Sequence, residues 1–420
     1  MSKNARDKRP YVKPVTRVEL DQTNVKLRWV LVAVFFVIAI TAFGIGIHEL
    51  LKTEPGWQSV RASSDQPNSG TEITLMYDYS DLGATASQVN KALETKYSQV
   101  CTDAFAIFSP DISREGLGNV NYVNASPNQE ITVDPALYGA FELLERYGNR
   151  NIFLAPVYVE YDRIFRSESD PEAADNDPAR NPEAKAYINE LIRYTFDEQM
   201  ISLELLGDNR IRLNVAQAYL DYAAENSIDK FIDFGWMRNA FVVDYLADQL
   251  RDADYTNGYL ASYDGFTRNL MEDDTPFNLN LFHLEGKDIS VPAVMEYVGR
   301  TSLVFLRSYP LDELDEWCYY VYEDGSIVTS MIDPADGVSK HALPEMVSYS
   351  KAFGCAEILL NVLPAYVTDG FQQETVNSLT DKQIFSAWFD GDDLHHNDPS
   401  LKLRLIADQA GNVVRTVPVK

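Results

Sequence analysis

Hydrophobic and polar residues follow two different periods along this chain, which predict a mixture of helices and strands. Apolar side chains recur every three or four residues in stretches that predict amphipathic helices at 85–104, 135–147 and 239–250. The middle helix has the clearest limits, because Asp134 is a good N-cap and Gly148 suits the end. β-branched, aliphatic and aromatic runs predict strands at 72–79, 255–262, 302–306, 317–322, 326–331 and 401–407. This mixture predicts an α+β fold with a mixed or antiparallel sheet and flanking helices.

The amino-terminal part has the pattern of a membrane anchor. The first 28 residues contain eight Lys or Arg, and the 19 residues Trp29–Ile47 are uncharged and long enough to cross a bilayer. By the positive-inside rule, we expect residues 1–28 to be a cytoplasmic tail, 29–48 a transmembrane helix and 49–69 a linker. Residues 70–420 then form an extracytoplasmic domain, and the protein is expected to be a single-pass protein of the cell membrane. A cleaved signal peptide is the alternative, although its apolar region usually spans only about 7 to 15 residues.

The net charge of the chain narrows the classes of molecule that it is expected to bind. The formal net charge is −27, and because the first 28 residues carry +5, the rest of the chain carries −32. Such a surface repels nucleic acid, so no nucleic-acid partner is expected. With three cysteines, the chain does not rely on a disulfide framework. Residues 166–185 are acidic, interrupted by prolines and poor in apolar side chains, which predicts a solvated loop insert.

Two distant stretches supply oxygen-bearing side chains that suit a hard cation. Asp333 and Asp336 lie in a Pro/Gly turn that follows a strand-like run. Glu357 and Asn361 are four residues apart in an apolar helical stretch, so both point to the same face of the helix. Carboxylate and carboxamide oxygens are the ligands that Mg²⁺ prefers. The residues therefore predict a magnesium site formed by Glu357, Asn361 and Asp333.

Several stretches, in one order along residues 69–420, resemble the FAD:protein FMN transferases, the ApbE family. The family run Asp-Leu-Gly-Gly-Ile-Ala-Lys-Gly-Tyr-Ala-Val-Asp is similar to Asp233–Asp244, and His-Ile-Ile-Asp-Pro-x-Thr-Gly is similar to Ser330–Gly337. The family's Ala-Asp-Ala-Leu-x-Thr is similar to Ala356–Asn361. The family's Gly-Thr strand is more weakly similar to Gly70–Leu75, and its Ser-containing stretch is more weakly similar to Phe108–Ser113.

The resemblance implies a T-fold-like domain that transfers FMN from FAD to a Thr or Ser of a target protein with the help of Mg²⁺. FAD is then the substrate or ligand, and the partners are a flavin nucleotide and a protein acceptor. The positions that correspond to flavin contacts in the family are Ser109, Asp233, Asn239, Ser262, Tyr263, Ser330, Asp333 and Asp336.

Key positions differ from the family pattern. Asn239 stands where the family has lysine, Ser262 and Tyr263 stand near its paired glycines, and Ser330 replaces its histidine. Asp336 replaces the threonine of the turn, and the metal-binding Asp and Thr correspond to Glu357 and Asn361. A catalytically inactive flavin-binding protein is therefore the first alternative to an enzyme, and a surface interaction protein of the same fold is the second.

Each candidate position also has a purely structural interpretation. Glu357 and Asn361 can form a solvent-facing strip of a surface helix, and Asp333 can initiate a turn. Asp233 can cap the segment that enters the next helix, and Ser109 can be a turn residue.

Overall fold

The computed structural model describes residues 55–62, 73–311 and 313–419. The predicted tail, the predicted transmembrane helix, most of the linker and the Gly70-Thr71 pair lie outside the described residues. Within the described ranges, no helix is long and apolar enough to span a membrane. Residues 54–420 form one compact unit that contains both clusters of buried apolar side chains, so this unit has what it needs to fold on its own.

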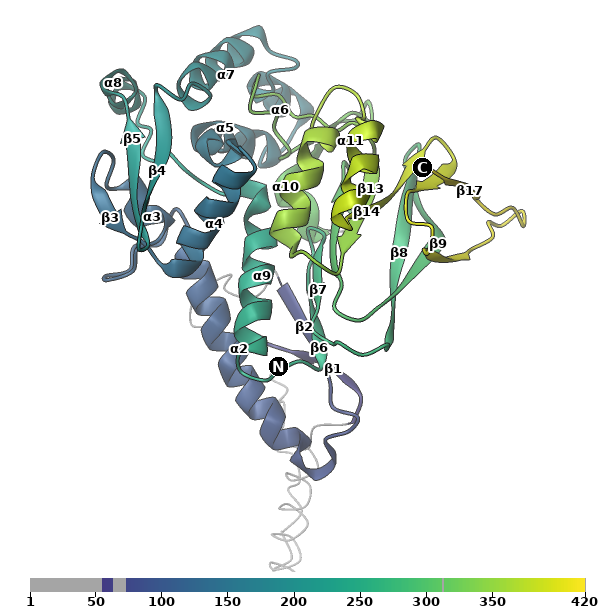
Figure 1. The fold of residues 1–420 in the computed structure, drawn as a ribbon. Coiled ribbons are helices and arrows are strands. Elements are labelled where there is room, and N and C mark those ends of the chain that lie inside the picture. Colours follow the sequence, from purple (N-terminus) through teal and green to yellow (C-terminus); the bar gives the residue numbers. More distant parts are fainter. Residues whose placement is uncertain (1–54, 63–72, 312, 420) are drawn as a thin grey trace, which may run out of the picture. The chain divides into compact units, whose positions relative to one another are not determined.

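A nine-stranded sheet forms the centre of the unit (Figure 1). In spatial order its strands are β1 (Trp57–Val60), β2 (Ile73–Asp78), β6 (Gly258–Ser262), β7 (Phe266–Asn269), β10 (Ser302–Arg307), β13 (Glu345–Ser350), β14 (Phe385–Asp390), β15 (Asp393–His396) and β17 (Arg415–Pro418). Neighbouring strands are antiparallel except β15 and β17, which are parallel. The predicted α+β class with a mainly antiparallel sheet is confirmed.

Three helices cover one face of this sheet (Figure 1). They are α2 (Ala86–Phe108), α9 (Arg238–Arg251) and α10 (Cys355–Tyr366). Helix α9 packs on β6 and β7, α10 packs on β10 and β13, and α2 packs on α9. Side chains alternate along β10, so Val304 and Leu306 join the large core beneath these helices.

The opposite face of the nine-stranded sheet is covered by a second, three-stranded sheet. Its order is β16 (Lys402–Leu405), β9 (Asp288–Val298) and β8 (Pro276–Glu285). Leu303 and Phe305 of β10 point to this side and join a smaller core with Met295 and Val347. Burial on both faces explains why every residue of β10 and β13 is buried.

Residues 120–225 form a mainly helical region. It contains α3 (Val120–Asn124), α4 (Pro135–Arg146), α5 (Ala155–Phe165), α6 (Asp170–Asn176), α7 (Pro182–Thr195), α8 (Gln217–Glu225) and a small sheet in the order β3 (Glu130–Thr132), β5 (Arg210–Val215), β4 (Ile201–Gly207). The remaining elements are the hairpin β11 (Tyr319–Val321) and β12 (Ile327–Thr329), helix α11 (Gln373–Ser378), and the 3-10 turns η1 (Gly83–Thr85), η2 (Asn151–Leu154), η3 (Gly235–Met237), η4 (Glu313–Cys318) and η5 (Leu379–Lys382). Asp134 caps α4 as predicted, because its side chain accepts a hydrogen bond from the Ala136 amide at 2.8 Å.

Residues 166–185, expected to be a solvated loop, instead contain α6 and the first turn of α7. Of the three prolines that suggested a loop, Pro171 and Pro182 lie in the first turns of these helices, where a missing amide hydrogen costs nothing, and Pro178 lies in the turn between them. Two of the acidic side chains form hydrogen bonds within the protein: the Tyr320 hydroxyl donates to Asp170 at 3.0 Å, and the Tyr322 hydroxyl donates to Asp177 at 3.0 Å. The strand expected at 317–322 is likewise shorter, because η4 occupies its first residues.

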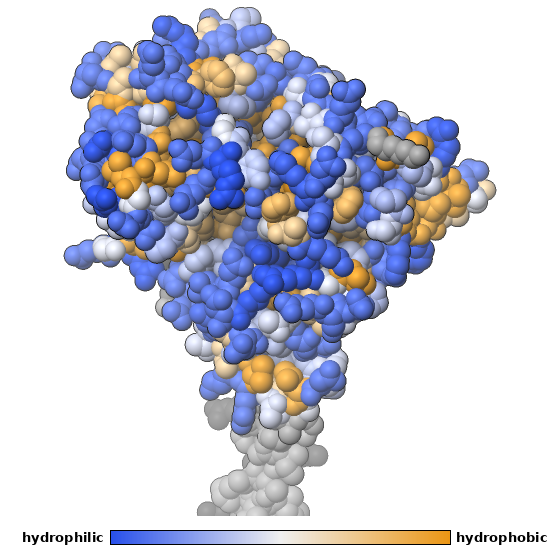
Figure 2. Space-filling model, viewed as in Figure 1, coloured by the Kyte–Doolittle hydropathy of each residue, from blue (hydrophilic) through white to orange (hydrophobic). Residues whose placement is uncertain are grey.

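The visible face of the unit is mainly hydrophilic (Figure 2), in keeping with the strongly negative net charge. Hydrophobic residues gather at the edge where β9 and β17 lie. Exposed apolar side chains in that part of the chain include Leu405, Ile406 and Val413.

Candidate functional site

A cleft of about 800 Å³ lies where the carboxyl end of α2, helix α5 and the start of α9 meet. Its volume is within the range of about 300–1,000 Å³ that is typical of small-molecule sites. Four of the predicted flavin-contact residues line it together: Ser109, Asp233, Tyr263 and Ser330. The resemblance to the family therefore selected positions that share one cleft, although they come from four separate stretches of the chain.

Polar turn residues build one wall of the cleft. The Ser109 hydroxyl follows α2 and accepts hydrogen bonds from the amides of Asp111 at 3.1 Å and Ile112 at 3.3 Å. The Asp233 carboxylate accepts a hydrogen bond from the Gly235 amide at 2.9 Å. Gly235 has a φ of 52°, and a Cβ there would lie 2.6 Å from the Tyr158 ring. Ser109 and Asp233 thus fill the structural roles that the sequence left open, while still lining the cleft.

Three cationic side chains reach the same cleft: Arg166, Lys230 and Arg238. Lys230 pairs with Asp111 at 2.5 Å, and Arg166 pairs with Asp162 at 3.3 Å. The carboxylates of both pairs are at least half exposed, so each pair contributes only about 0–1 kcal/mol and can be exchanged for another anion at little cost.

Burial raises the pKa of Asp233 above its usual value, although the amide of Gly235 and the charges of Arg238 and Lys230 oppose the shift. The cleft thus combines cations with a carboxyl group that protonates more readily than an exposed aspartate.

Aromatic rings line the other side of the cleft. Tyr263 and Trp317 meet edge to face, with ring centroids 6.3 Å apart and planes at 81°. Trp317 is 41% exposed, so its ring is accessible to a planar ligand. The backbone carbonyl of Tyr263 accepts a hydrogen bond from Arg307 at 2.9 Å, which fixes the loop that carries the ring.

Two predicted flavin contacts, Asn239 and Ser262, are buried and do not line the cleft. Asn239 donates to the Asp264 carboxylate at 2.8 Å. The Ser262 hydroxyl accepts a hydrogen bond from the Phe266 amide at 2.9 Å and so closes the turn between β6 and β7. In this structure both side chains form hydrogen bonds within the protein.

The oxygens of Glu357 and Asn361 are already engaged by protein donors. The Tyr147 hydroxyl donates to Glu357 Oε1 at 2.7 Å, and Arg146 lies 3.7 Å from the same oxygen. Asn361 donates to the Glu357 backbone carbonyl at 2.8 Å, and its Oδ1 accepts a hydrogen bond from the Lys382 ammonium at 3.0 Å. Both residues lie together on α10 as expected, but the cations beside them are the side chains of Arg146 and Lys382.

Asp333 belongs to a second cluster with its own cation. The Lys340 ammonium lies 2.9 Å from Asp333, 2.7 Å from Asp336 and 3.3 Å from Asp369. Burial alone would lower the pKa of Lys340, but its hydrogen bonds to Asp336 and Asp333 raise it above its usual value. Asp333 also accepts a hydrogen bond from the Ala335 amide at 2.9 Å, as a turn residue does.

These arrangements do not fit a divalent cation held by Glu357, Asn361 and Asp333. Each predicted ligand already contacts a lysine, an arginine or a tyrosine hydroxyl, and Mg²⁺ would have to displace those donors. Among the residues that the structure describes, no group of three His, Cys, Asp or Glu side chains could hold a metal ion.

The fold of this chain is similar to the folds of several solved structures. The ApbE protein from Thermotoga maritima superposes with a TM-score of 0.54 at 12% identity, over 79% of this chain and 94% of that one. The flavin transferase ApbE from Vibrio cholerae superposes with a TM-score of 0.51 at 12% identity, over 84% of this chain and 97% of that one. The fold is similar to that of the ApbE proteins. No protein-family model and no curated protein matches the sequence, so the likeness holds for the fold alone.

Within this ApbE-like fold, α10 is positioned by a carboxylate from α9. The amides of Cys355 and Ala356 donate to the two oxygens of Asp244, each at 2.9 Å. Arg268 pairs with the same carboxylate at 2.8 Å. Gly354 is required at this approach, since a Cβ there would lie 2.3 Å from the Asp244 carboxylate. The end of the Asp233–Asp244 run thus has a structural role: it caps the helix that carries Glu357 and Asn361.

The sequence did not single out the cations of the cleft or the two lysines that contact the predicted metal ligands. Arg166 and Lys230 are far apart in the chain, and neither lies in a recognisable motif. Lys340 could have been suspected from the sequence, because it is a basic residue 7 positions after Asp333 in a strongly acidic chain, whereas Lys382 lies 21 positions after Asn361.

Proposed function

We propose that this chain binds a flavin nucleotide, in the form of FAD, in its ApbE-like cleft and does so without a divalent cation. The observation that carries the proposal is the combination of accessible aromatic rings and three cationic side chains in one cleft of suitable volume. An isoalloxazine ring would stack on Tyr263 and Trp317, and a pyrophosphate would pair with Arg166 and Lys230.

The electrostatic cost of binding is small. Arg166 and Lys230 already pair with exposed carboxylates, and exchanging such a pair for a diphosphate keeps each cation neutralised. The protein as a whole is strongly negative, which weakens long-range attraction of an anion. We therefore expect moderate affinity that falls as salt is added.

A second candidate is the transfer of FMN from FAD to a Thr or Ser hydroxyl of a partner protein, with AMP as the leaving group. The superposition over 97% of the Vibrio cholerae flavin transferase favours it. Against it, Glu357 and Asn361 contact Tyr147 and Lys382, so the expected Mg²⁺ ligands are not free. Binding without transfer is therefore the function that the contacts support better.

One experiment separates the two candidates. Residues 54–420 are purified and tested for bound flavin by visible absorbance, then incubated with FAD, Mg²⁺ and a threonine-containing acceptor peptide. We expect saturable FAD binding and no fluorescent, covalently flavinylated peptide. Flavinylated peptide would establish the transferase instead, and the absence of any FAD binding would refute both.

We also propose that residues 29–48 anchor this unit to the cell membrane with its amino terminus in the cytoplasm. The support is the uncharged stretch Trp29–Ile47 after a basic tail. The full chain should stay with membranes after alkaline carbonate extraction, whereas a chain lacking residues 1–53 should not. Release of the full chain would contradict the anchor.

A further inference from the structure

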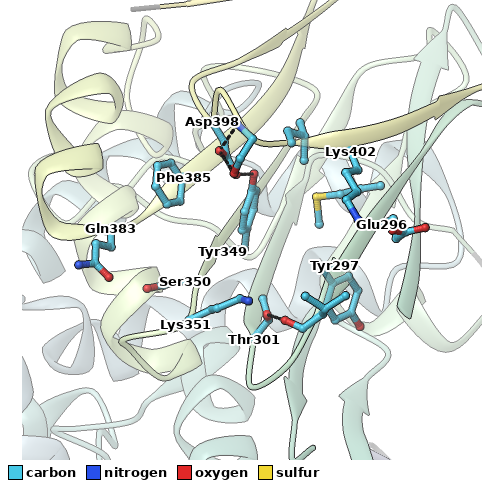
Figure 3. Close-up of a pocket in the computed structure, with 14 residues that line it drawn as sticks. Glu296, Tyr297, Thr301, Tyr349, Ser350, Lys351, Gln383, Phe385, Asp398 and Lys402 are labelled. Carbon is cyan, nitrogen blue, oxygen red and sulfur yellow. Dashed lines mark hydrogen bonds and ion pairs between the residues drawn. The ribbon is translucent and has the colours of Figure 1, made fainter. Parts of the chain in front are cut away.

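A second cavity, of about 410 Å³, lies on the other side of the nine-stranded sheet (Figure 3). It lies between β9, the ends of β13 and β14, and the segment that leads into β16. Tyr349 lines it and belongs to the smaller core with Leu303 and Phe305, on the face turned away from α9 and α10. The cavity is therefore separate from the flavin cleft.

The walls of this cavity are mainly apolar, and most of its polar groups are already satisfied. Tyr349 donates to Asp398 Oδ2 at 2.7 Å, and the amide and hydroxyl of Ser400 both donate to Asp398 Oδ1 at 2.7 Å. Lys402 pairs with Glu296 at 3.0 Å on the rim. The oxygens of the buried Asp398 are engaged by these hydrogen-bond donors, and Lys402 and Glu296 neutralise each other.

Lys351 differs from these groups. Within the described part of the chain, its ammonium forms no ion pair and no hydrogen bond. In Figure 3 its side chain extends below Tyr349, and its nitrogen end lies towards Thr301. A lysine without a partner beside apolar walls is the arrangement that recognises an anion with an apolar body.

From this geometry we infer that the cavity binds an apolar monocarboxylate, with the carboxylate on Lys351 and the apolar chain against Met295, Tyr297 and Leu401. The volume sets the size of the ligand. Because one water molecule takes about 30 Å³ of liquid volume, 410 Å³ holds on the order of a dozen heavy atoms. A saturated carboxylate of about ten carbons matches both the volume and the charge.

The test is calorimetric titration of residues 54–420 with decanoate in detergent-free buffer. We expect one saturable site that is unaffected by prior saturation with FAD. Lys351→Gln should weaken binding about tenfold, the effect of losing one charge-assisted hydrogen bond. Lys402→Gln is the matched control: it removes the other lysine of the cavity, which is already paired, and should change affinity less than twofold.

Two further measurements locate the ligand. Val298→Trp places a large ring in the cavity and should abolish binding, while decylammonium, which has the same chain and the opposite charge, should bind at least tenfold more weakly than decanoate. Lys351 is exposed, so its replacement leaves folding intact. The inference is overturned by the absence of saturable decanoate binding, by equal effects of the two lysine substitutions, by unchanged binding in Val298→Trp, or by equal affinity for decylammonium.

Discussion

Replacing Asp244 with alanine should destabilise the unit far more than replacing its neighbour Asp248. The Asp244 carboxylate accepts two amide hydrogen bonds at the start of α10 and pairs with Arg268, whose side chain is only 13% exposed. Breaking a buried ion pair by removing one partner costs about 3–5 kcal/mol. Asp248 also lies 3.4 Å from Arg268 but is 61% exposed, so its removal should cost less than about 1 kcal/mol.

The expected loss for Asp244→Ala lies at the lower end of that range, about 3–4 kcal/mol, because Arg268 keeps Asp248 as a partner. Unfolding entropy is about 2.1 cal/mol/K per residue, so a unit of this length loses about 1.3 °C of Tm per kcal/mol. Thermal unfolding followed by circular dichroism should show a Tm lower by about 4–5 °C for Asp244→Ala and by about 1 °C or less for Asp248→Ala. Equal shifts in the two variants would refute the assigned capping of α10 by Asp244.

Three predictions concern the cleft proposed to bind flavin, each measured by FAD titration of residues 54–420. Lys230→Gln should weaken FAD binding about fivefold and reduce its dependence on salt, and Lys402→Gln should do neither, because Lys402 lies outside the cleft. Binding should tighten as the pH falls, because the raised pKa of Asp233 lets this carboxyl take up a proton, and so lose its negative charge near the diphosphate, at a higher pH than an exposed aspartate. Asp233→Asn should flatten that pH dependence, and an unchanged pH profile would exclude the role of Asp233. Tyr263→Gly should weaken binding several-fold and relieve quenching of flavin fluorescence if the ring stacks, whereas tighter binding would mean that the ring obstructs the cleft.

Local patterns were sufficient to predict much of the fold. The helix that begins after Asp134 and the antiparallel strands depend on caps, periodicity and β-branched content, all of which act over short stretches of chain. The region 166–185 was predicted incorrectly because its stability is not local. Its acidic groups meet Tyr320 and Tyr322, which lie about 150 residues further along the chain.

Contacts between residues far apart in the chain also limited what the sequence could predict about the candidate site. Residues that share the cleft, such as Ser109 and Ser330, could be selected only through the family resemblance. The sequence also could not show that the oxygens of the proposed metal ligands meet lysine side chains from elsewhere in the chain, Lys340 and Lys382. No spacing rule along the chain reveals which carboxylate a flexible lysine will contact.

The metal dependence of FAD binding tests the central claim most directly. Residues 54–420 are titrated with FAD in EDTA and again in excess Mg²⁺, with binding followed by flavin fluorescence. We predict the same dissociation constant in both, within about twofold, since Lys382 and Tyr147 already occupy the oxygens that a cation would need. FAD binding that requires Mg²⁺ and disappears in Asn361→Ala would contradict the account.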